Sequence, residues 1–331
     1  MLAAAADEAD LAPATDADTD PLGRMDRRQL VDSRGVTFAE FRRTLKPRYA
    51  RIWLEIAAGW LVLAGISAAL WVFAPGLGLL GLLLVPPAGF ALGLCVHFIN
   101  MFMHEAAHYG LAASRPANDR LANAFVTILI GQDVKRYRDV HFDHHRHLGT
   151  VRDTERAYFN RMSPRFLFEA LTGIQALRVI ALQRGRARSQ PARPQPSRGL
   201  PRQLLLGALF HLLVLGAGAY FRQYVFVLTW LAGFGGAFPF FTALRQVLEH
   251  RSEAAQPQLN YAERDHGPCN RLFGAGPLAS ILGGVGFNRH MLHHWEPQIS
   301  YTRFADLERY LRDTSAAPAI AQRSITYVAA L

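Results

Sequence analysis

Residues 77–103 read LGLLGLLLVPPAGFALGLCVHFINMFM, a run of 27 predominantly apolar residues. An α-helix rises about 1.5 Å per residue, so this run would be about 40 Å long as a helix. The hydrocarbon core of a bilayer is only ~30 Å thick. The helix should therefore cross a membrane and project beyond it, with the next residues, His104-Glu105-Ala106-Ala107-His108, on its emerging end. Pro86-Pro87 predicts a kink within it.

Three other apolar runs, 52–74, 203–221 and 224–244, are also long enough to span a bilayer. The turns Ala74-Pro75-Gly76 and Arg222-Gln223 join the four runs into two hairpins. All of the 36 Lys and Arg residues except Arg222 lie on the other side of these hairpins. The positive-inside rule places that side, with both termini, in the cytoplasm. The sequence predicts an all-α integral membrane protein with four transmembrane helices in two hairpins and a cytoplasmic helical cap.

The remaining segments differ in composition. We expect residues 1–25, which are acidic and rich in alanine, to be disordered, and residues 26–51 to form a basic cytoplasmic lead-in. Residues 166–182 carry a polar residue at every third position, which predicts a helix lying in the membrane interface. Residues 52–312 would form the membrane domain and residues 313–331 a C-terminal tail.

The charge and the cysteines exclude other classes of protein. A net charge of +10 would suit nucleic-acid binding, but no nucleic-acid motif accompanies it and the arginines lie beside apolar runs. A membrane-surface role therefore fits better. The two cysteines exclude a disulfide framework and a Cys-rich metal site.

The polar segments contain clustered histidines. Residues 141–147 read HFDHHRH, and 290–294 read HMLHH, so the spacing i, i+3, i+4 occurs twice. These positions share a helix face, and we expect His141, His144 and His145 to converge on one point. Neutral imidazole is the commonest protein ligand for transition metals. The predicted ligands, enough for two metal ions, are His104, His108, His141, His144, His145, His250, His290, His293 and His294.

Several neighbouring residues are candidates for a supporting role. Arg245 and Glu249 precede His250 and would orient the imidazoles. Asn288 would hold a metal-bound water or cap a loop. Other acidic residues would accept hydrogen bonds from ligands or remain solvated: Asp143, Asp153 and Glu155. His97, on the same helix face as His104, would line a substrate channel or be structural.

Three readings of the histidines compete at this point. His104-Glu105-Ala106-Ala107-His108 fits the zinc-protease pattern H-E-x-x-H, with Glu105 as general base. That reading needs only one further ligand and leaves seven clustered histidines unexplained. Metal storage or a solvated basic face would not repeat one spacing twice. A metal transporter would need ligands within the spans, whereas these lie outside them.

The three boxes in this order resemble those of the membrane fatty acid desaturase family. The resemblance covers roughly residues 50–312 and includes Arg245-Gln246-Val247-Leu248-Glu249-His250 and the third-box context from Asn288 to Pro297. It implies a di-iron site, O₂ as co-substrate, a lipid acyl substrate and no catalytic residues beyond the metal ligands. Hydroxylases and carotenoid oxygenases or ketolases share these boxes and remain alternatives. The family also implies electrons from a ferredoxin or a cytochrome b5. We find no Rossmann fingerprint and no fused heme- or flavin-binding segment, so the donor would be a separate protein.

Overall fold

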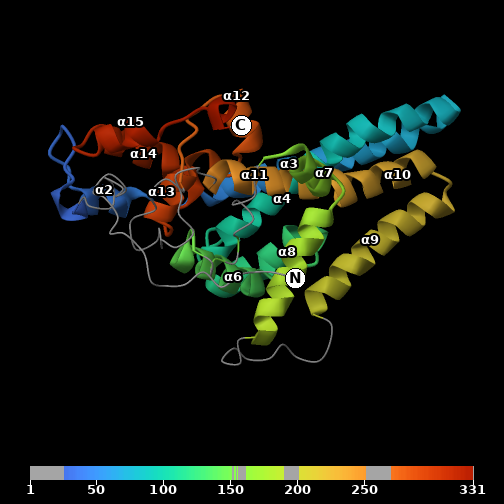
Figure 1. Cartoon of the computed structure of the whole chain (residues 1–331), viewed down its shortest axis with the longest axis horizontal. Coiled ribbons are helices and arrows are strands. Elements are labelled where there is room, and N and C mark those ends of the chain that lie inside the picture. Colours follow the sequence, from blue (N-terminus) through green and yellow to red (C-terminus); the bar gives the residue numbers. More distant parts are fainter. Residues whose placement is uncertain are drawn as a thin grey trace.

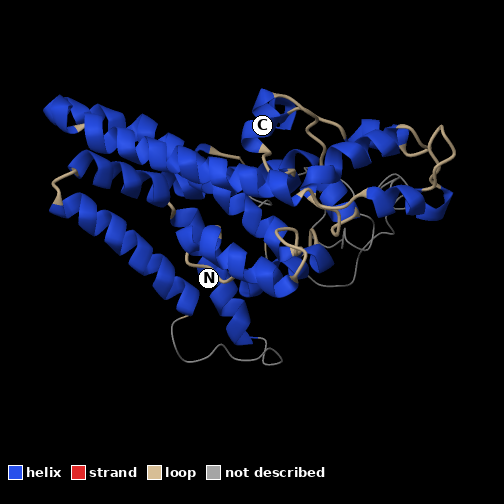
Figure 2. Cartoon of the chain, turned by 180° about the vertical axis from the view of Figure 1, so that it is seen from behind, coloured by secondary structure: helices blue, strands red, loops and turns tan. Residues whose placement is uncertain are grey.

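The computed structural model is almost entirely helical (Figures 1 and 2). It describes residues 26–150, 153, 155, 162–189, 201–250 and 270–330. The segment 1–25, predicted to be disordered, lies outside the described residues. No strand occurs in the described ranges.

Four helical segments are long and apolar enough to cross a membrane. The first is α3 (Tyr49–Phe73), and the second joins η3 (Pro75–Leu84) to α4 (Val85–Ala107). The third is α9 (Arg202–Tyr220), and the fourth joins α10 (Tyr224–Ala232), η6 (Gly233–Ala237) and α11 (Phe238–His250). No more than a third of any of their most apolar stretches is buried within the protein. Their outward apolar side chains suit lipid, which confirms the predicted all-α integral membrane fold.

The second span differs in detail from the predicted kinked helix. Residues 75–84 form a 3₁₀ helix interrupted at Gly78, whose φ is 54°. The α-helix starts at Val85, so that Pro86 and Pro87 occupy its first turn. Proline fits there because the first N–H groups of a helix have no intrahelical acceptor. The prolines therefore mark a change of helix type instead of a bend within one helix.

Small residues bring the second and fourth spans close together. The fourth span contains a π-helical turn, Gly233–Ala237. A Cβ added to Gly93 would lie 2.4 Å from the Cβ of Ala237, and one added to Gly233 would lie 2.5 Å from Leu92 Cδ2. Close backbone contact of this kind is typical of helix packing in membranes. It fixes the C-terminal ends of α4 and α11, where His104, His108 and His250 lie.

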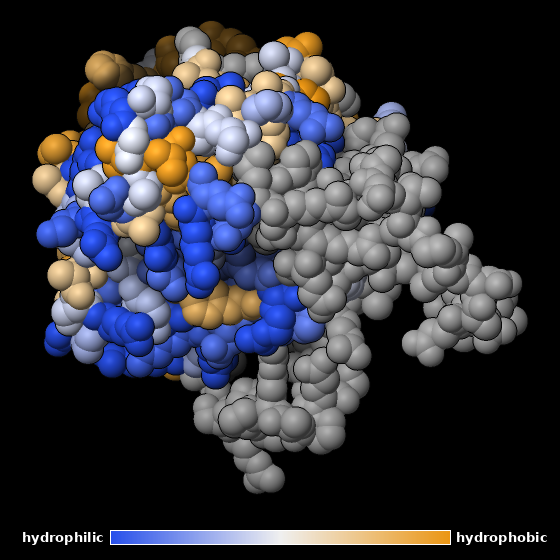
Figure 3. Space-filling view, turned by 90° about the vertical axis from the view of Figure 1, so that its left-hand side faces the viewer, coloured by the Kyte–Doolittle hydropathy of each residue, from blue (hydrophilic) through white to orange (hydrophobic). Residues whose placement is uncertain are grey.

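One end of the bundle carries the remaining helices (Figure 1). Between the hairpins lie α5 (Arg115–Phe125), η4 (Thr127–Leu129), α6 (Val134–His147), α7 (Pro164–Leu171) and α8 (Ile174–Ser189). After the fourth span follow α12 (Pro277–Leu282), η8 (Phe287–Arg289), α13 (His290–Trp295), η9 (Tyr301–Arg303), α14 (Phe304–Arg312), α15 (Ala317–Arg323) and α16 (Tyr327–Ala330). We call these helices, with η2 (Arg27–Gln29) and α2 (Phe38–Thr44), the cap. Apart from the atoms drawn in grey, its end face is mostly hydrophilic (Figure 3).

Both ends of the described chain contact the segment 270–296, which contains the third histidine box. Arg27 forms an ion pair with Glu296 at 2.8 Å and lies over the Trp295 ring, which Phe38 also contacts. At the other end, Tyr327 stacks on Phe273 at 3.9 Å between ring centroids. The segment that contains α13 is thus held from two sides.

The interfacial segment forms two helices where the sequence predicts one over 166–182. Gly173 separates α7 from α8 with a φ of 74°, which favours glycine. Two of the four polar positions face inward, since Glu169 and Gln175 are buried, whereas Thr172 and Arg178 are exposed. The apolar Phe168 and Leu177 are 63% and 67% exposed. An apolar outer face is the side expected to contact lipid.

Candidate metal centre

Four helices deliver the histidine boxes to one place. α4 carries His104 and ends just before His108, and α6 carries the second box. α11 ends at His250, and α13 consists almost entirely of the third box. All nine predicted histidines lie in two adjacent groups. Within each group, the possible ligand atoms lie within 4.8 Å of one another. The five-histidine site contains His104, His108, His141, His145 and His293, and the four-histidine site contains His144, His250, His290 and His294.

The two H-x-x-H-H boxes divide between the sites in opposite ways. On α6, His141 and His145 join the five-histidine site, and His144 joins the other. On α13, His290 and His294 join the four-histidine site, while His293 joins the five-histidine site. Residues i and i+4 differ by only about 40° around a helix, whereas i+3 lies on the other side of residue i. The prediction that His141, His144 and His145 converge on one point is therefore wrong, because each helix lies between two sites.

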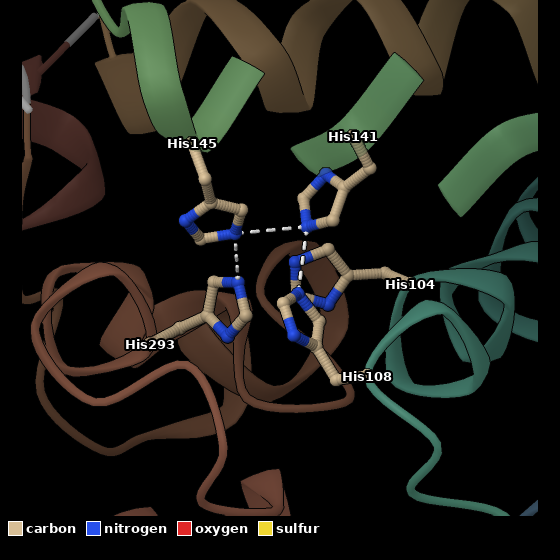
Figure 4. A group of neighbouring side chains, drawn as sticks. All are labelled: His104, His108, His141, His145 and His293. Atoms are coloured by element: carbon tan, nitrogen blue, oxygen red, sulfur yellow. Dashed lines mark hydrogen bonds between the residues drawn. The ribbon is translucent and has the colours of Figure 1, made fainter. Parts of the chain in front are cut away.

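Ring nitrogens of different histidines lie within hydrogen-bond distance of one another, and the hydrogens on these rings cannot satisfy all of the contacts (Figure 4). In the five-histidine site, Nε2 of His145 lies 2.8 Å from Nε2 of His293 and 3.0 Å from Nε2 of His141. Nε2 of His141 is also 2.9 Å from Nε2 of His108. A neutral imidazole nitrogen either donates one hydrogen or accepts one, so four such atoms in a chain satisfy at most two of their three contacts.

The four-histidine site repeats this arrangement. Nε2 of His290 lies 2.9 Å from Nε2 of His250 and 3.1 Å from Nε2 of His294. In the five-histidine site, Nε2 of His104 is also buried without a hydrogen-bond partner in the described part of the chain. A cation at the centre of each group would receive these lone pairs. The residues present therefore fit two metal ions with nitrogen ligands.

Burial keeps most of these rings neutral. It lowers the pKa values of His290, His293 and His294 well below the usual range, so their lone pairs are available near pH 7. His144 differs. Burial acts to lower its pKa, but the charge of Asp153 and the hydrogen bond to it outweigh burial and raise the pKa to about 9.

Two carboxylates outside the predicted ligand set contact the histidines. Nδ1 of His144 lies 2.9 Å from Asp153 Oδ1, so Nε2 is the nitrogen that can face a metal. Nδ1 of His141 lies 3.6 Å from Glu155 Oε1. Asp143, the other acidic candidate, forms ion pairs with Arg146 and His147.

The remaining supporting candidates lie around the four-histidine site. Arg245 pairs with Glu249 at 2.9 Å and lies over the Phe287 ring, and Glu249 approaches Nε2 of His290 at 3.9 Å. Asn288 donates a 2.6 Å hydrogen bond to the Gly274 carbonyl. That contact is the loop-capping role that the sequence left open for Asn288.

Sequence reasoning missed Arg138. This buried side chain donates to the carbonyls of Ala106 and Ala107, in the last turn of α4, and pairs with Asp119 at 2.5 Å. It also lies 3.8 Å from the centroid of the Tyr109 ring. Arg138 therefore joins the first box to the second. Its position one turn before His141 was the only signal, because its partners are far away in the sequence.

Glu105 does not share the site with its neighbouring histidines. It is buried, and its Oε2 accepts a weak 3.4 Å hydrogen bond from the Tyr301 backbone N–H. The Glu105 carboxylate also packs against Gly110. A general base of the zinc-protease type must reach a metal-bound water, and this orientation gives that reading no support.

The other histidines of the described residues lie outside the two groups. His97 contacts Thr242 at 3.3 Å and lines a cavity of about 340 Å³ that reaches His104. His211 contacts the Leu129 carbonyl and accepts a hydrogen bond from Trp230, so it joins α9 to its neighbours. His147 lies at the end of α6. His266 is outside the described residues.

Residues 80–326 match the family model described as fatty acid desaturase. The chain belongs to this family. The match covers more than half of the chain and includes all nine histidines. The fatty acid desaturase family is di-iron dependent, and the two histidine groups could each bind a metal ion. The chain is thus an integral membrane member of an oxidoreductase family that acts on lipids.

Proposed function

We propose that this protein is an O₂-dependent di-iron desaturase that introduces a double bond into a lipid acyl chain. The observation that carries the proposal is the convergence of nine imidazoles, seven of them buried, into two adjacent groups where the cap meets the ends of the spans. His104, His108, His141, His145 and His293 would hold one iron, and His144, His250, His290 and His294 the other. When bound, the iron pair would supply the means to activate O₂ against an unactivated C–H bond.

The reaction must balance. Removing two hydrogen atoms from adjacent carbons releases two electrons and two protons, and reducing O₂ to two waters takes four of each. The remaining two protons come from water. The remaining two electrons must come from a donor, since we identify no redox group that this chain would hold apart from the irons. A one-electron carrier of the ferredoxin or cytochrome b5 type fits this need.

The chain's own residues would position and shield the chemistry. Asp153 holds His144 by Nδ1 and thereby fixes its tautomer. Arg138 holds the first and second boxes together. The buried rings exclude bulk water, which would otherwise consume a reactive oxidant. The cavity beside His104 would receive the substrate chain.

The electron donor would approach the outer face of α6. All four residues of the four-histidine site are buried, whereas His108 and His145 of the five-histidine site are partly exposed. Phe142 is 37% exposed, and its ring centroid lies 5.2 Å from that of His108. Lys135, Arg136 and Arg146 are exposed on the same helix. Donor electrons would thus enter at the five-histidine site.

Two measurements test the proposal. Purified protein should contain about two irons per chain, and lipids of a host that expresses it should gain a double bond absent from an empty-vector control. Lipid mass spectrometry would equally reveal a hydroxylated or ketone product, which would indicate an oxygenase instead. One zinc without iron would contradict the proposal.

A variant of Glu105 separates the desaturase from the zinc protease. Glu105→Gln removes the base that a protease needs, but here it changes a side chain directed toward Tyr301. We expect bound iron and measurable lipid oxidation to remain. Complete inactivation with full iron content would contradict the assignment of the first box.

A further inference from the structure

The cavity beside His104 combines an apolar lining with several polar side chains. Its volume of about 340 Å³ suits part of a small molecule or lipid chain. Apolar residues such as Ile130, Val179 and Phe238 line part of it. Besides His104 and Tyr137, six uncharged polar side chains also line it: His97, Asn100, Gln132, Gln175, Thr242 and Gln246.

The four amides in this lining have few protein partners. Oδ1 of Asn100 is buried and has no hydrogen-bond partner in the described ranges. If the amide were turned, its nitrogen would occupy the same position, so one polar atom stays unsatisfied in either orientation. The side chains of Gln132, Gln175 and Gln246 form no hydrogen bond within the part of the chain that the structure describes. Unlike Asn100 Oδ1, their polar atoms are not fully enclosed by protein. Unpaired buried polar groups cost stability, and those within a membrane span usually serve a function.

His97 supplies a hydrogen-bond acceptor on the same wall. The Thr242 hydroxyl donates to the Phe238 carbonyl at 3.0 Å, so it must accept the hydrogen bond from Nδ1 of His97. The neutral ring therefore carries its hydrogen on Nδ1, and Nε2 has a lone pair. His97 and Asn100 share a face of α4 with His104, at spacings i, i+3 and i+7. Asn100 precedes His104 by four residues, about 6 Å along the helix.

The charged residues of the lining already have partners. Arg245 pairs with Glu249, and Glu155 lies beside His141. They belong to the surroundings of the metal centre. The amides and His97 are the groups that remain for a ligand.

We propose that the substrate is a lipid chain with a hydroxyl or amide group within a few carbons of the carbon that is oxidised. Such a group would donate to Asn100 or to Nε2 of His97, while the apolar wall holds the hydrocarbon. A plain methylene chain would leave these side chains unsatisfied. The inference rests on the proposed function and adds the chemical class of its substrate.

A binding experiment tests this independently of turnover. The iron-loaded protein in lipid nanodiscs is titrated with radiolabelled methyl palmitate and with methyl 3-hydroxypalmitate, which has the same chain and one added hydroxyl. One hydrogen bond formed in a buried site is worth about a fivefold difference in Kd. We expect the hydroxylated ester to bind at least that much more tightly. Equal binding of the two esters would overturn the proposal.

Variants locate the effect within the cavity. Asn100→Leu and Gln246→Leu replace amides with apolar side chains of similar size, and each should reduce the preference for the hydroxylated ester without weakening binding of the plain one. Gln298→Leu is the matched control, because Gln298 is exposed on the cap beside Arg42. An unchanged preference in both cavity variants would contradict the proposal. If neither variant folds, the Kd ratio of the unmodified protein decides.

The outcome is separable from failure of the proposed function. Iron content and oxidation of either ester are measured on the same preparation. Protein without iron, or with iron but inactive on both esters, would contradict the desaturase. If the protein binds the two esters equally and desaturates the plain one, only the polar-substrate inference is contradicted.

Discussion

At the scale of single residues, the carboxylate that hydrogen-bonds one ring nitrogen of a histidine decides which nitrogen is left to bind a metal. Nδ1 of His144 has a fully buried carboxylate partner, Asp153, within 3.0 Å. Asp153 thereby fixes the ring so that Nε2 faces His250 and His294. The sequence offered Asp153 only as one of several acidic neighbours.

Asp153→Ala should weaken the four-histidine site. Loss of a partner of this kind typically lowers metal affinity by about 10- to 100-fold. The check is the rate at which a chelator removes iron from purified protein, with iron content measured over time. Asp139→Ala is the control, since Asp139 is exposed on α6. Equal rates of iron loss in the two variants would argue against a role for Asp153.

At the scale of helices, the metal centre depends on how α4 and α6 are joined. The Arg138 guanidinium satisfies two carbonyls at the end of α4 and the carboxylate of Asp119. Both members of this ion pair are largely buried. Removing one partner of a buried pair typically costs about 3–5 kcal/mol.

Arg138→Leu should therefore lower both the thermal stability and the iron content. Arg138→Lys should be intermediate, because an ammonium group cannot reproduce the planar donor arrangement of the guanidinium. Arg136→Leu, two residues earlier and exposed, is the control and should change neither quantity. Thermal unfolding in detergent and metal analysis measure both effects. A stable, iron-replete Arg138→Leu protein would show that other contacts join the helices.

The helix scale is also where sequence reasoning reached its limit. Apolar runs and histidine spacings are local properties, so the four spans and all nine clustered histidines were predictable. The division of His144 from His141 and His145 was not, because it depends on how α6 and α13 are rotated relative to each other. The change of helix type at Val85 and the π-turn at Gly233 depend on packing between spans. Arg138 depends on carbonyl groups, which no side-chain pattern reveals.

At the scale of the whole molecule, one end is polar and helical, and the other consists of apolar spans. We propose that the polar end lies in the cytoplasm, because in the sequence all basic residues except Arg222 lie outside the spans and their two short turns. A reporter inserted after Arg188 should then read as cytoplasmic, and one inserted at Gln223 should read as external. The reverse pattern would contradict the orientation and the proposed side of electron delivery.

The last prediction concerns that delivery. The outer face of α6 presents Lys135, Arg136 and Arg146 around the exposed Phe142. Opposite charge accelerates association of an acidic donor, and salt screens the attraction. We therefore expect the rate of electron transfer from a reduced, acidic ferredoxin to fall as ionic strength rises.

Charge reversal on α6 should have a similar effect. Lys135→Glu combined with Arg146→Glu should slow transfer at low salt by roughly tenfold or more and flatten its salt dependence, without changing iron content. The control is Arg309→Glu, which alters an equally exposed arginine on α14. Stopped-flow oxidation of the ferredoxin measures the rate. If Arg309→Glu slows transfer and the α6 variant does not, the donor binds at α14, and the partial exposure of His108 and His145 has another cause.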